Sequence, residues 1–198
     1  MAKNMQPVLK RCRTLGVSPA AMGYSKTSNK NPGGQRRAKK SEYATQLTEK
    51  QKVKFVYGVQ EKQFRNYYEK ASRAEGNTGE VLISLVERRL DNVVYRLGFA
   101  ATRRQARQLV NHGHFNVNGK RVNIPSYMVK VGDVVGVCEN SVSNSFFKKL
   151  KEDNAFVAAP KWLDRDSNTL QGKVIAVPTK ADVDFEIAEH LIVELYSK

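Results

Sequence analysis

Cysteine, histidine and tryptophan are scarce in this chain of 198 residues, which contains two, three and one of them, respectively. Cys12 and Cys138 lie far apart in different sequence contexts, so we expect reduced thiols rather than a disulfide framework or a zinc site. No apolar run approaches the roughly 20 residues that a membrane-spanning helix needs. The beginning, MAKNMQPVLKRCR, lacks the apolar core of a secretory signal. These absences favour a cytoplasmic protein, with an organellar protein as the minor alternative.

Acidic residues are also few. The 19 Asp and Glu residues are outnumbered by 34 Lys and Arg residues, which gives a formal net charge of +15 and a pI near 9.9. This surplus favours an anionic partner, nucleic acid first and an anionic membrane second, over a basic protein without such a partner. Acids are absent from residues 92–130, which contain seven Lys and Arg residues. We therefore expect this stretch to bind a polyanion.

No pattern of catalytic residues stands out. His112 and His114 flank Gly113, but they lack nearby metal ligands and a nucleophile that they would activate. We expect them to be histidines at a helix end, facing solvent or RNA. The segments GNTGE and NPGGQ lack the Lys-Ser/Thr ending of a phosphate-binding loop. The sequence therefore predicts no enzyme, metal, cofactor or small-molecule substrate.

Residues 1–41 contain ten Lys and Arg residues and no acid. The run SKTSNKNPGGQRRAKK has almost no apolar side chain to bury, so we expect a basic N-terminal arm that is disordered when free. Either the arm orders along phosphate backbones, or it is a solvated tail. The candidate RNA contacts in the arm are Arg36, Arg37, Lys39 and Lys40.

Residues 42–89 are expected to form a helical domain. Apolar periodicity predicts helices at about 44–57 and 61–73, and a longer helix at about 79–97 that bends near residues 89–90. We expect Phe64 and one of the two following tyrosines in the core, while the other tyrosine reaches RNA by stacking or by its hydroxyl. The candidate RNA contacts in this domain are Lys50, Lys52, Lys54, Arg65, Asn66, Tyr67 and Tyr68.

Residues 90–181 are expected to form a second domain, with its RNA-binding part at about 90–150. Thr102 can cap a short helix at 103–112 that has one apolar face. Its arginines are expected to project from the opposite side, either toward RNA or as a solvated helix face. The candidate RNA contacts on this helix are Arg103, Arg104, Arg107 and His112.

A β-hairpin is expected to follow this helix. Alternating apolar and polar residues flank Asn118-Gly119, a dipeptide typical of a type I′ turn because both central positions need positive φ. Lys120 and Arg121 come directly after this turn, so we expect both to project toward a ligand. Further along, the sequence predicts a tight turn at 131–134, strands at 134–138 and 174–177, a helix around 146–150 and an acidic C-terminal helix within 182–198 that docks elsewhere on the chain.

A short arginine-bearing helix and a basic hairpin fit folded RNA better than duplex DNA. They cannot read the deep, narrow groove of A-form RNA, but they can sit on the backbone at a junction or loop. Contacts with phosphates would then supply most of the affinity and a steep salt dependence.

Several motifs resemble one family. The run LDNVVYRLGFAATRRQARQLVNHGHFNVNGKRVNIPSYMVKVGD resembles the S-four RNA-binding domain. That module also occurs in RNA-modifying enzymes, but this chain has no room or motif for their catalytic domain. The runs QLTEKQKVKFVYGVQEKQFRNYY, GNTGE and EHLIVELYSK resemble the bacterial-type ribosomal protein S-four family of the small (30S) subunit. Three hypotheses are thus considered: a ribosomal protein, an RNA-modifying enzyme, and a free-standing RNA chaperone or translational repressor.

The resemblance implies an α+β fold with a basic N-terminal arm, a mostly helical domain that the C-terminal helix at 182–198 completes, and a second domain. The second domain would hold an αL-type module, two helices and a β-hairpin, on a small antiparallel sheet. Some family members bind zinc in the arm through four cysteines. Because Cys12 is the only cysteine in that region, we expect no zinc here.

The resemblance also implies a function. Members are structural constituents of the small subunit that bind 16S rRNA at a multi-helix junction and nucleate assembly of the 30S body. They lie near proteins five and twelve and influence translational accuracy. With proteins three and five they line the mRNA entry channel, and in some bacteria they repress their own operon by binding mRNA.

Overall fold

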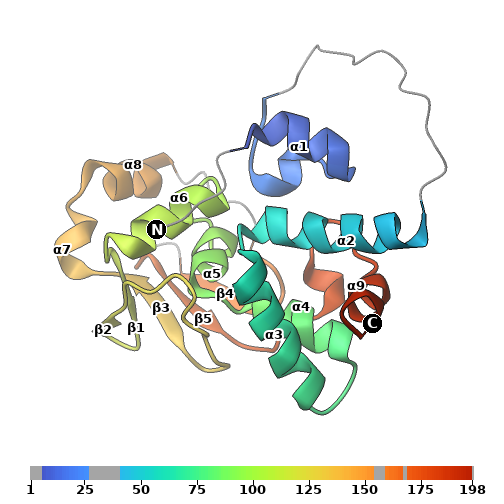
Figure 1. Ribbon diagram of the computed structural model, residues 1–198. Helices are drawn as coiled ribbons and strands as arrows, with labels where there is room; N and C mark the ends of the chain where they lie inside the picture. The colour runs from blue at the N-terminus through green and yellow to red at the C-terminus, as the bar shows by residue number, and fades with distance from the viewer. Residues whose placement is uncertain (1–5, 27–40, 154–158, 167–168, 198) are drawn as a thin grey trace. The chain divides into compact units, whose positions relative to one another are not determined.

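The computed structural model describes residues 6–26, 41–153, 159–166 and 169–197 (Figure 1). The chain divides into two compact units. Residues 1–83 and 183–198 form the helical unit, and residues 84–182 form the sheet unit. Helices and one small antiparallel sheet together make an α+β fold, as predicted. The boundary between the two units lies after residue 83, whereas the domain boundary predicted from the sequence lies after residue 89.

The helical unit contains most of the longer helices. Its elements are α1 (Val8–Leu15), η1 (Pro19–Met22), α2 (Glu42–Tyr57), α3 (Glu61–Arg73), the beginning of α4 (Thr78–Glu87) and α9 (Glu189–Ser197). Ser41 begins α2, because its side chain accepts a hydrogen bond from the backbone N–H of Ala44. Gly58 ends α2 with φ of 64°, a left-handed conformation that glycine adopts without steric cost.

The expectation that residues 1–41 are disordered was wrong for residues 8–22, which form α1 and η1. Cys12, Leu15, Val17 and Met22 are all buried, and Sγ of Cys12 lies 3.8 Å from Sδ of Met22. These few apolar side chains close a small core that composition alone did not reveal. The expected RNA contacts Arg36, Arg37, Lys39 and Lys40 lie outside the described residues.

The end of the chain packs on α2. The Phe185 ring lies 6.1 Å from the Tyr57 ring, centroid to centroid, and Nζ of Lys52 donates a 3.1 Å hydrogen bond to the carbonyl of Glu186. Residues 182–198 are not one helix, since α9 begins only at Glu189. The segment before it reaches α2 in an irregular conformation, with Ile187 buried.

The sheet unit has five antiparallel strands in the order β2-β1-β3-β5-β4. The strands are β1 (Phe115–Val117), β2 (Lys120–Arg121), β3 (Val134–Val137), β4 (Leu163–Asp166) and β5 (Gln171–Val174). Its other elements are the end of α4, α5 (Leu90–Arg96), α6 (Arg103–Asn111), α7 (Glu139–Val142), α8 (Ser145–Asp153) and η2 (Lys180–Asp182). The strand predicted at 174–177 lies at 171–174, and its partner β4 was not predicted.

The long helix predicted at 79–97 is broken into α4 and α5. Arg89 has extended backbone angles, φ −66° and ψ 138°, and forms an isolated bridge with Met128. The backbone N–H of Leu90 then donates to the carbonyl of Tyr127 at 2.9 Å. The break lies where the bend was expected, and the loop at 125–129 supplies the backbone partners that a continuous helix would not need.

The core of the sheet unit lies between α5, α6 and one face of the sheet. Apolar side chains of both helices join Phe115 and Val135 of the sheet, and Phe147 of α8 packs against Phe115. Gly172 of β5 lets Leu97 approach closely, because a Cβ at this position would overlap the Leu97 side chain. The predicted hairpin is confirmed, with φ of 51° at Asn118 and 77° at Gly119.

A candidate RNA-binding surface on the sheet unit

Helix α6 rests on a buried network of charged and polar side chains. The Glu87 carboxylate, which is 0% exposed, accepts hydrogen bonds from Nη2 of Arg96 at 2.8 Å and from Nδ2 of Asn92 at 2.6 Å. Oδ1 of Asn92 accepts a 2.8 Å hydrogen bond from Nε of Arg103. Buried charges are stable when they are paired and hydrogen-bonded. The network therefore fixes α6 against α5 and the end of α4.

The expectation that Arg103 projects from α6 toward RNA was wrong about its direction. Its side chain is buried, and the guanidinium lies over the ring of Tyr95, with Cζ 4.4 Å from the ring centroid. This cation–π contact and the hydrogen bond to Asn92 turn Arg103 toward α5. Arg103 therefore supports the surface from below.

Arg107 lies at the border between the network and the surface. Its Nη1 is 3.8 Å from Oδ2 of Asp91, a buried carboxylate that also accepts a 2.6 Å hydrogen bond from Nη2 of Arg89. One carboxylate thus faces two guanidinium groups. The formal net charge of this trio is positive, and Arg107 is its half-buried member.

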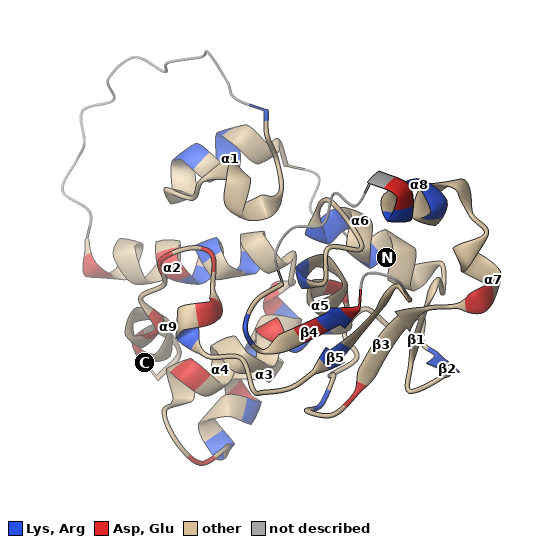
Figure 2. Ribbon diagram, turned by 180° about the vertical axis from the view of Figure 1, so that it is seen from behind, with Lys and Arg blue, Asp and Glu red and all other residues tan. Residues whose placement is uncertain are grey.

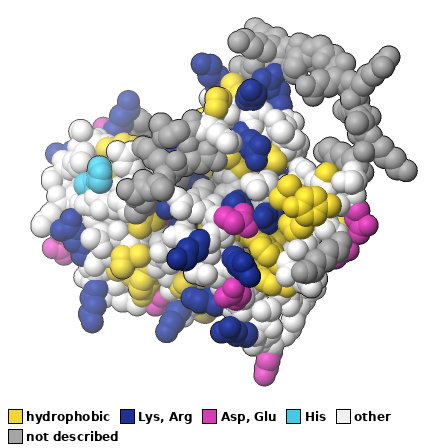
Figure 3. Space-filling view, in the orientation of Figure 1, with side chains coloured by type: hydrophobic (Ala, Val, Ile, Leu, Met, Phe, Trp, Pro, Cys, Tyr) yellow, Lys and Arg dark blue, Asp and Glu magenta, His cyan; other side chains and the backbone are white. Residues whose placement is uncertain are grey.

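The exposed face of α6 presents Arg104, Gln108 and His112. Helix α8 adds three exposed lysines that the sequence reading did not select, although the run KKLK follows the predicted apolar pair. They are Lys148, Lys149 and Lys151. Figure 2 shows α6 and α8 side by side with basic residues on both, and Figure 3 shows basic side chains and a histidine exposed on this part of the sheet unit.

The β1–β2 hairpin joins this face at the end of α6. Nε of Arg121 donates to the carbonyl of Gly113 at 2.8 Å, and its Nη2 donates to the carbonyl of His112 at 3.1 Å. A cation at a helix C-terminus also complements the helix dipole. Arg121 is therefore held in place while remaining exposed, and Lys120 beside it is exposed as well.

The nearest acid to the hairpin is already engaged. Oδ1 of Asp133 accepts a 2.8 Å hydrogen bond from Nδ2 of Asn118, and its Oδ2 accepts one from the backbone N–H of Lys130 at 2.8 Å. Asp133 thus joins two turns. Neither α6 nor β2 contains an acid, so the charged side chains of both elements are basic, whereas Glu139 of α7 and Glu152 of α8 are exposed acids.

His114 and Cys138 lie below the end of α6. Burial, followed by the charges of His112 and Arg121, lowers the pKa of His114, whose Nδ1 lies 3.0 Å from Oγ of Ser141. Burial raises the pKa of the Cys138 thiol, despite the nearby charge of Arg121. A neutral imidazole and a protonated thiol are therefore expected near neutral pH, and such a pair is not an activated nucleophile.

The lysines predicted in α2 are largely compensated by acids. Nζ of Lys50 lies 2.8 Å from Oε1 of Glu61, and Lys54 pairs with Oε2 of the same carboxylate. Lys52 pairs with Glu49 at 2.9 Å. Together they present far less free charge than the sequence suggested, so they are weaker candidates than the residues of α6. Sequence alone did not show that α3 supplies a partner for α2.

The two tyrosines predicted in α3 differ in burial. Tyr67 is in the core, whereas Tyr68 is half-buried and stacks on Tyr196 of α9 with ring centroids 4.8 Å apart. Tyr67 is therefore the core tyrosine, and contact of Tyr68 with RNA stays a prediction. Arg65 is exposed and pairs with Glu69 at 3.5 Å, and Asn66 is exposed.

Other kinds of site were also sought in the described residues. No group of three or more His, Cys, Asp and Glu side chains in those residues is arranged to hold a metal ion. No helix among them is both long and apolar enough to cross a membrane.

Comparison of the sequence with those of known proteins identifies the family of this chain. The S4 domain model matches residues 88–135, and the model of the ribosomal protein S4/S9 N-terminal domain matches residues 3–87. The small ribosomal subunit proteins uS4 of Fusobacterium nucleatum and Lachnospira eligens are 56% and 52% identical to this chain, over the full length of both partners. The uS4 protein of Clostridioides difficile is 59% identical over 86% of this chain and 83% of its own. The chain therefore belongs to the uS4 family of small ribosomal subunit proteins.

Proposed function

We propose that this protein is a structural constituent of the small ribosomal subunit that binds 16S rRNA through α6, the β1–β2 hairpin and α8. The observation that carries the proposal is the exposed basic face of Arg104, Lys120 and Arg121, within a stretch that contains no acid. The names of the relatives and the match to an S4 domain support it. No enzymatic role is proposed.

The target is folded RNA at a multi-helix junction. The basic face is built from the side of a short helix and a tight hairpin, so it contacts backbone rather than base edges in a narrow groove. The buried network fixes α6 itself, and two carbonyl groups hold the guanidinium of Arg121 in position before binding. A pre-positioned surface loses less conformational entropy on binding than mobile side chains do, and this favours recognition of one backbone shape.

The finer roles follow from the family resemblance and remain part of this proposal. The protein binds 16S rRNA early and nucleates assembly of the 30S body in the cytoplasm. It lies near proteins five and twelve, where it contributes to translational accuracy, and lines the mRNA entry channel with proteins three and five. The same basic face suits repression of its own mRNA if that mRNA folds into a similar junction.

The RNA-binding role is tested with the full chain and a 16S rRNA fragment that contains the junction. Each phosphate contact contributes about one unit to the slope of log K against log salt. The double variant Arg104→Gln, Lys120→Gln is expected to bind more weakly and to lower this slope by about two units. A matched double variant, Lys161→Gln, Lys173→Gln, removes the same charge from exposed residues elsewhere in the sheet unit and is expected to change the slope less.

The ribosomal role is tested by gradient sedimentation of cell lysate. The protein is expected to sediment with the small subunit. A pool that is mainly free of ribosomes would contradict this role and favour a free-standing RNA chaperone. Unchanged RNA binding by the double variant on α6 and β2 would instead contradict the assignment of the surface.

A further inference from the structure

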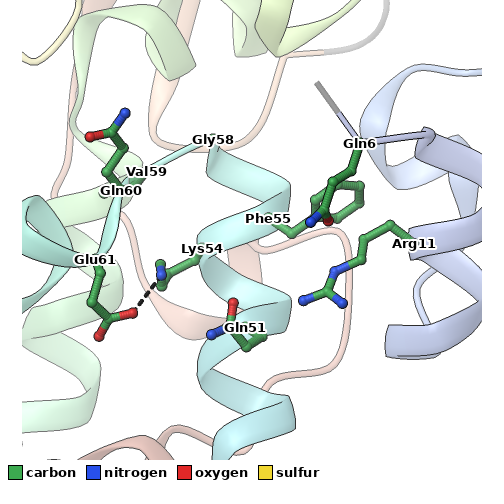
Figure 4. A pocket seen from close by; sticks show the side chains of 9 residues that line it. All are labelled: Gln6, Arg11, Gln51, Lys54, Phe55, Gly58, Val59, Gln60 and Glu61. Carbon is green, nitrogen blue, oxygen red and sulfur yellow. Dashed lines mark hydrogen bonds and ion pairs between the residues drawn. The ribbon is translucent and has the colours of Figure 1, made fainter. Parts of the chain in front are cut away.

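A polar crevice lies within the helical unit, between α1 and the end of α2 (Figure 4). It encloses about 300 Å³, at the lower end of the range for small-molecule pockets. Its lining includes Arg11, Gln51, Lys54, Phe55, Gln60 and Glu61. None of these residues belongs to the surface on α6 described above.

The charges in the crevice do not cancel. Lys54 pairs with Glu61, whose carboxylate also accepts hydrogen bonds from Lys50 at 2.8 Å and from the Tyr196 hydroxyl at 2.7 Å. Burial alone would raise the pKa of Glu61, but these hydrogen bonds lower it to about 2, so it is ionised and fully engaged. The remaining charge is the guanidinium of Arg11.

Arg11 is half-buried, and Figure 4 shows its side chain extending from α1 toward Gln51 on α2. Among the described residues, neither the Arg11 guanidinium nor the Gln51 amide has a hydrogen-bond or ion-pair partner. A partly desolvated guanidinium presents a planar set of donors that matches a phosphate or carboxylate. The crevice is therefore suited to an anion.

We propose that this crevice binds one nucleotide of the RNA, with its phosphate on Arg11 and its ribose or base edge on Gln51. The inference deepens the proposed function and rests on it. A carboxylate side chain of a protein would pair with Arg11 but leave Gln51 and most of the volume unfilled. A nucleotide fills the volume, and an amide both donates to and accepts from ribose hydroxyls and base edges.

The surroundings of the crevice favour RNA over an acidic protein segment. Helix α1 carries Lys10 and Arg13 as exposed cations next to Arg11, and no acid occurs in residues 1–41. A continuous backbone of phosphates contacts such a surface at several points. The buried ring of Phe55 lies in the wall of the crevice and supplies an apolar surface for the sugar or base.

The test measures the affinity of the full chain for the junction fragment of 16S rRNA over a series of salt concentrations. Arg11→Gln is expected to weaken binding about tenfold and to lower the salt slope by about one unit. Gln51→Met preserves charge and length, and is expected to weaken binding about threefold without changing the slope. Lys70→Gln is the matched control, since it removes one charge from an exposed residue of α3 outside the crevice.

Three results would overturn the proposal. An effect of Arg11→Gln on the salt slope no larger than that of Lys70→Gln would show that Arg11 does not bind a phosphate. If Gln51→Met lowered the salt slope by about one unit, or left the affinity unchanged, the proposed contact between Gln51 and a nucleotide would be contradicted. Normal binding to the isolated RNA but failed incorporation into small subunits would show that the crevice holds a protein group instead.

Two further measurements distinguish a loss of this site from a loss of folding and from a failure of the proposed function. Arg11→Lys preserves charge and is expected to melt like the unsubstituted protein while still losing affinity, because an ammonium cannot make the bidentate contact. If Arg11→Gln weakens RNA binding while the Arg104→Gln, Lys120→Gln variant does not, the crevice is supported as an RNA site and the proposed surface on α6 is contradicted. If only the Arg104→Gln, Lys120→Gln variant weakens binding, the crevice is contradicted and the surface on α6 is supported.

Discussion

Nε of Arg103 donates a 2.8 Å hydrogen bond to Oδ1 of Asn92, and this contact separates the roles of two adjacent arginines. Arg103 is buried against α5, whereas Arg104 is exposed on the opposite side of α6. One residue holds the helix in place, and the next presents its charge to solvent. The two are adjacent in the sequence TRRQARQLV, but Arg103 shares a helix face with the buried Ala106 and Val110, at i, i+3 and i+7, a signal that the sequence prediction missed.

Substitution of these two arginines is expected to have opposite consequences. Arg103→Gln should lower the free energy of unfolding by about 2 kcal/mol, because Asn92 loses a charge-assisted hydrogen bond in a buried position. It should leave the salt slope of RNA binding nearly unchanged. Arg104→Gln should leave stability within about 0.5 kcal/mol and lower the slope by about one unit.

Urea unfolding and binding titrations of both variants check this expectation. The paired design makes each variant the control for the other, because each removes one positive charge from α6. Equal loss of salt dependence in the two variants would show that Arg103 contacts phosphate, contrary to its buried position.

The pair of Glu87 and Arg96 is expected to be the strongest single point in the buried network. Glu87→Gln leaves the Arg96 guanidinium buried without its counter-charge, which costs about 3 kcal/mol or more. The double variant Glu87→Met, Arg96→Leu removes both charges and should recover much of this loss, since an apolar pair of similar volume is often as stable. Equilibrium unfolding of Glu87→Met, of Arg96→Leu and of the double variant gives the coupling energy. Additive losses would show that the two side chains act independently.

The sequence was sufficient for features that depend on local chemistry. Thr102 caps α6 through a hydrogen bond from the backbone N–H of Gln105, and Asn118-Gly119 forms the hairpin turn, both as expected. Each signal depends on residues within four positions of one another. The surface of α6 could therefore be located from the sequence, although the helical spacing that turns Arg103 inward was overlooked.

Features that depend on distant partners were missed. Strand β4 has the sequence LDRD, which is too polar and short to predict a strand, and only pairing with β5 explains it. Helix α1 is basic and short, and it is stabilised by burial of Cys12 and Leu15 rather than by a long apolar face. The lysines of α2 were assigned to RNA because their partner Glu61 lies on another helix.

Stability of the helical unit is expected to fall in acid through Glu61. Burial acts to raise the pKa of this carboxyl, but hydrogen bonds from Lys50, Lys54 and Tyr196 dominate and lower it from 4.5 to about 2. A carboxylate whose pKa is depressed on folding stabilises the folded state above pH 4.5. This contribution declines as the pH falls through 4.5 and is lost by about pH 2.

Glu61→Gln removes the titrating group while preserving the shape of the side chain. Because Glu61 is about half exposed, solvent screening limits the effect to roughly 1 kcal/mol at pH 7. The stability difference between the variant and the unsubstituted protein should shrink as the pH is lowered from 4.5 toward 2. A difference that stays constant over this range, measured by urea unfolding, would exclude Glu61 as the group responsible.

Gly113 is expected to couple the end of α6 to RNA binding through Arg121. Gly113 has φ of 72°, and a Cβ at this position would overlap the Arg121 guanidinium. Gly132 has φ of 92°, and a Cβ there would meet nothing within 4 Å. Alanine at either position therefore has a similar backbone strain of about 1–2 kcal/mol, but only Gly113→Ala also displaces a cation of the candidate RNA-binding surface.

Gly113→Ala should lower the melting temperature more than Gly132→Ala, and only Gly113→Ala should weaken RNA binding and its salt dependence. The displaced guanidinium loses its hydrogen bonds to the carbonyls of Gly113 and His112, so it is no longer held at the end of α6. If this is the mechanism, Gly113→Ala combined with Arg121→Gln should bind RNA no more weakly than Arg121→Gln alone. A further loss in the double variant would show that Gly113 acts through the backbone of α6, because Arg121 would already be absent from the comparison.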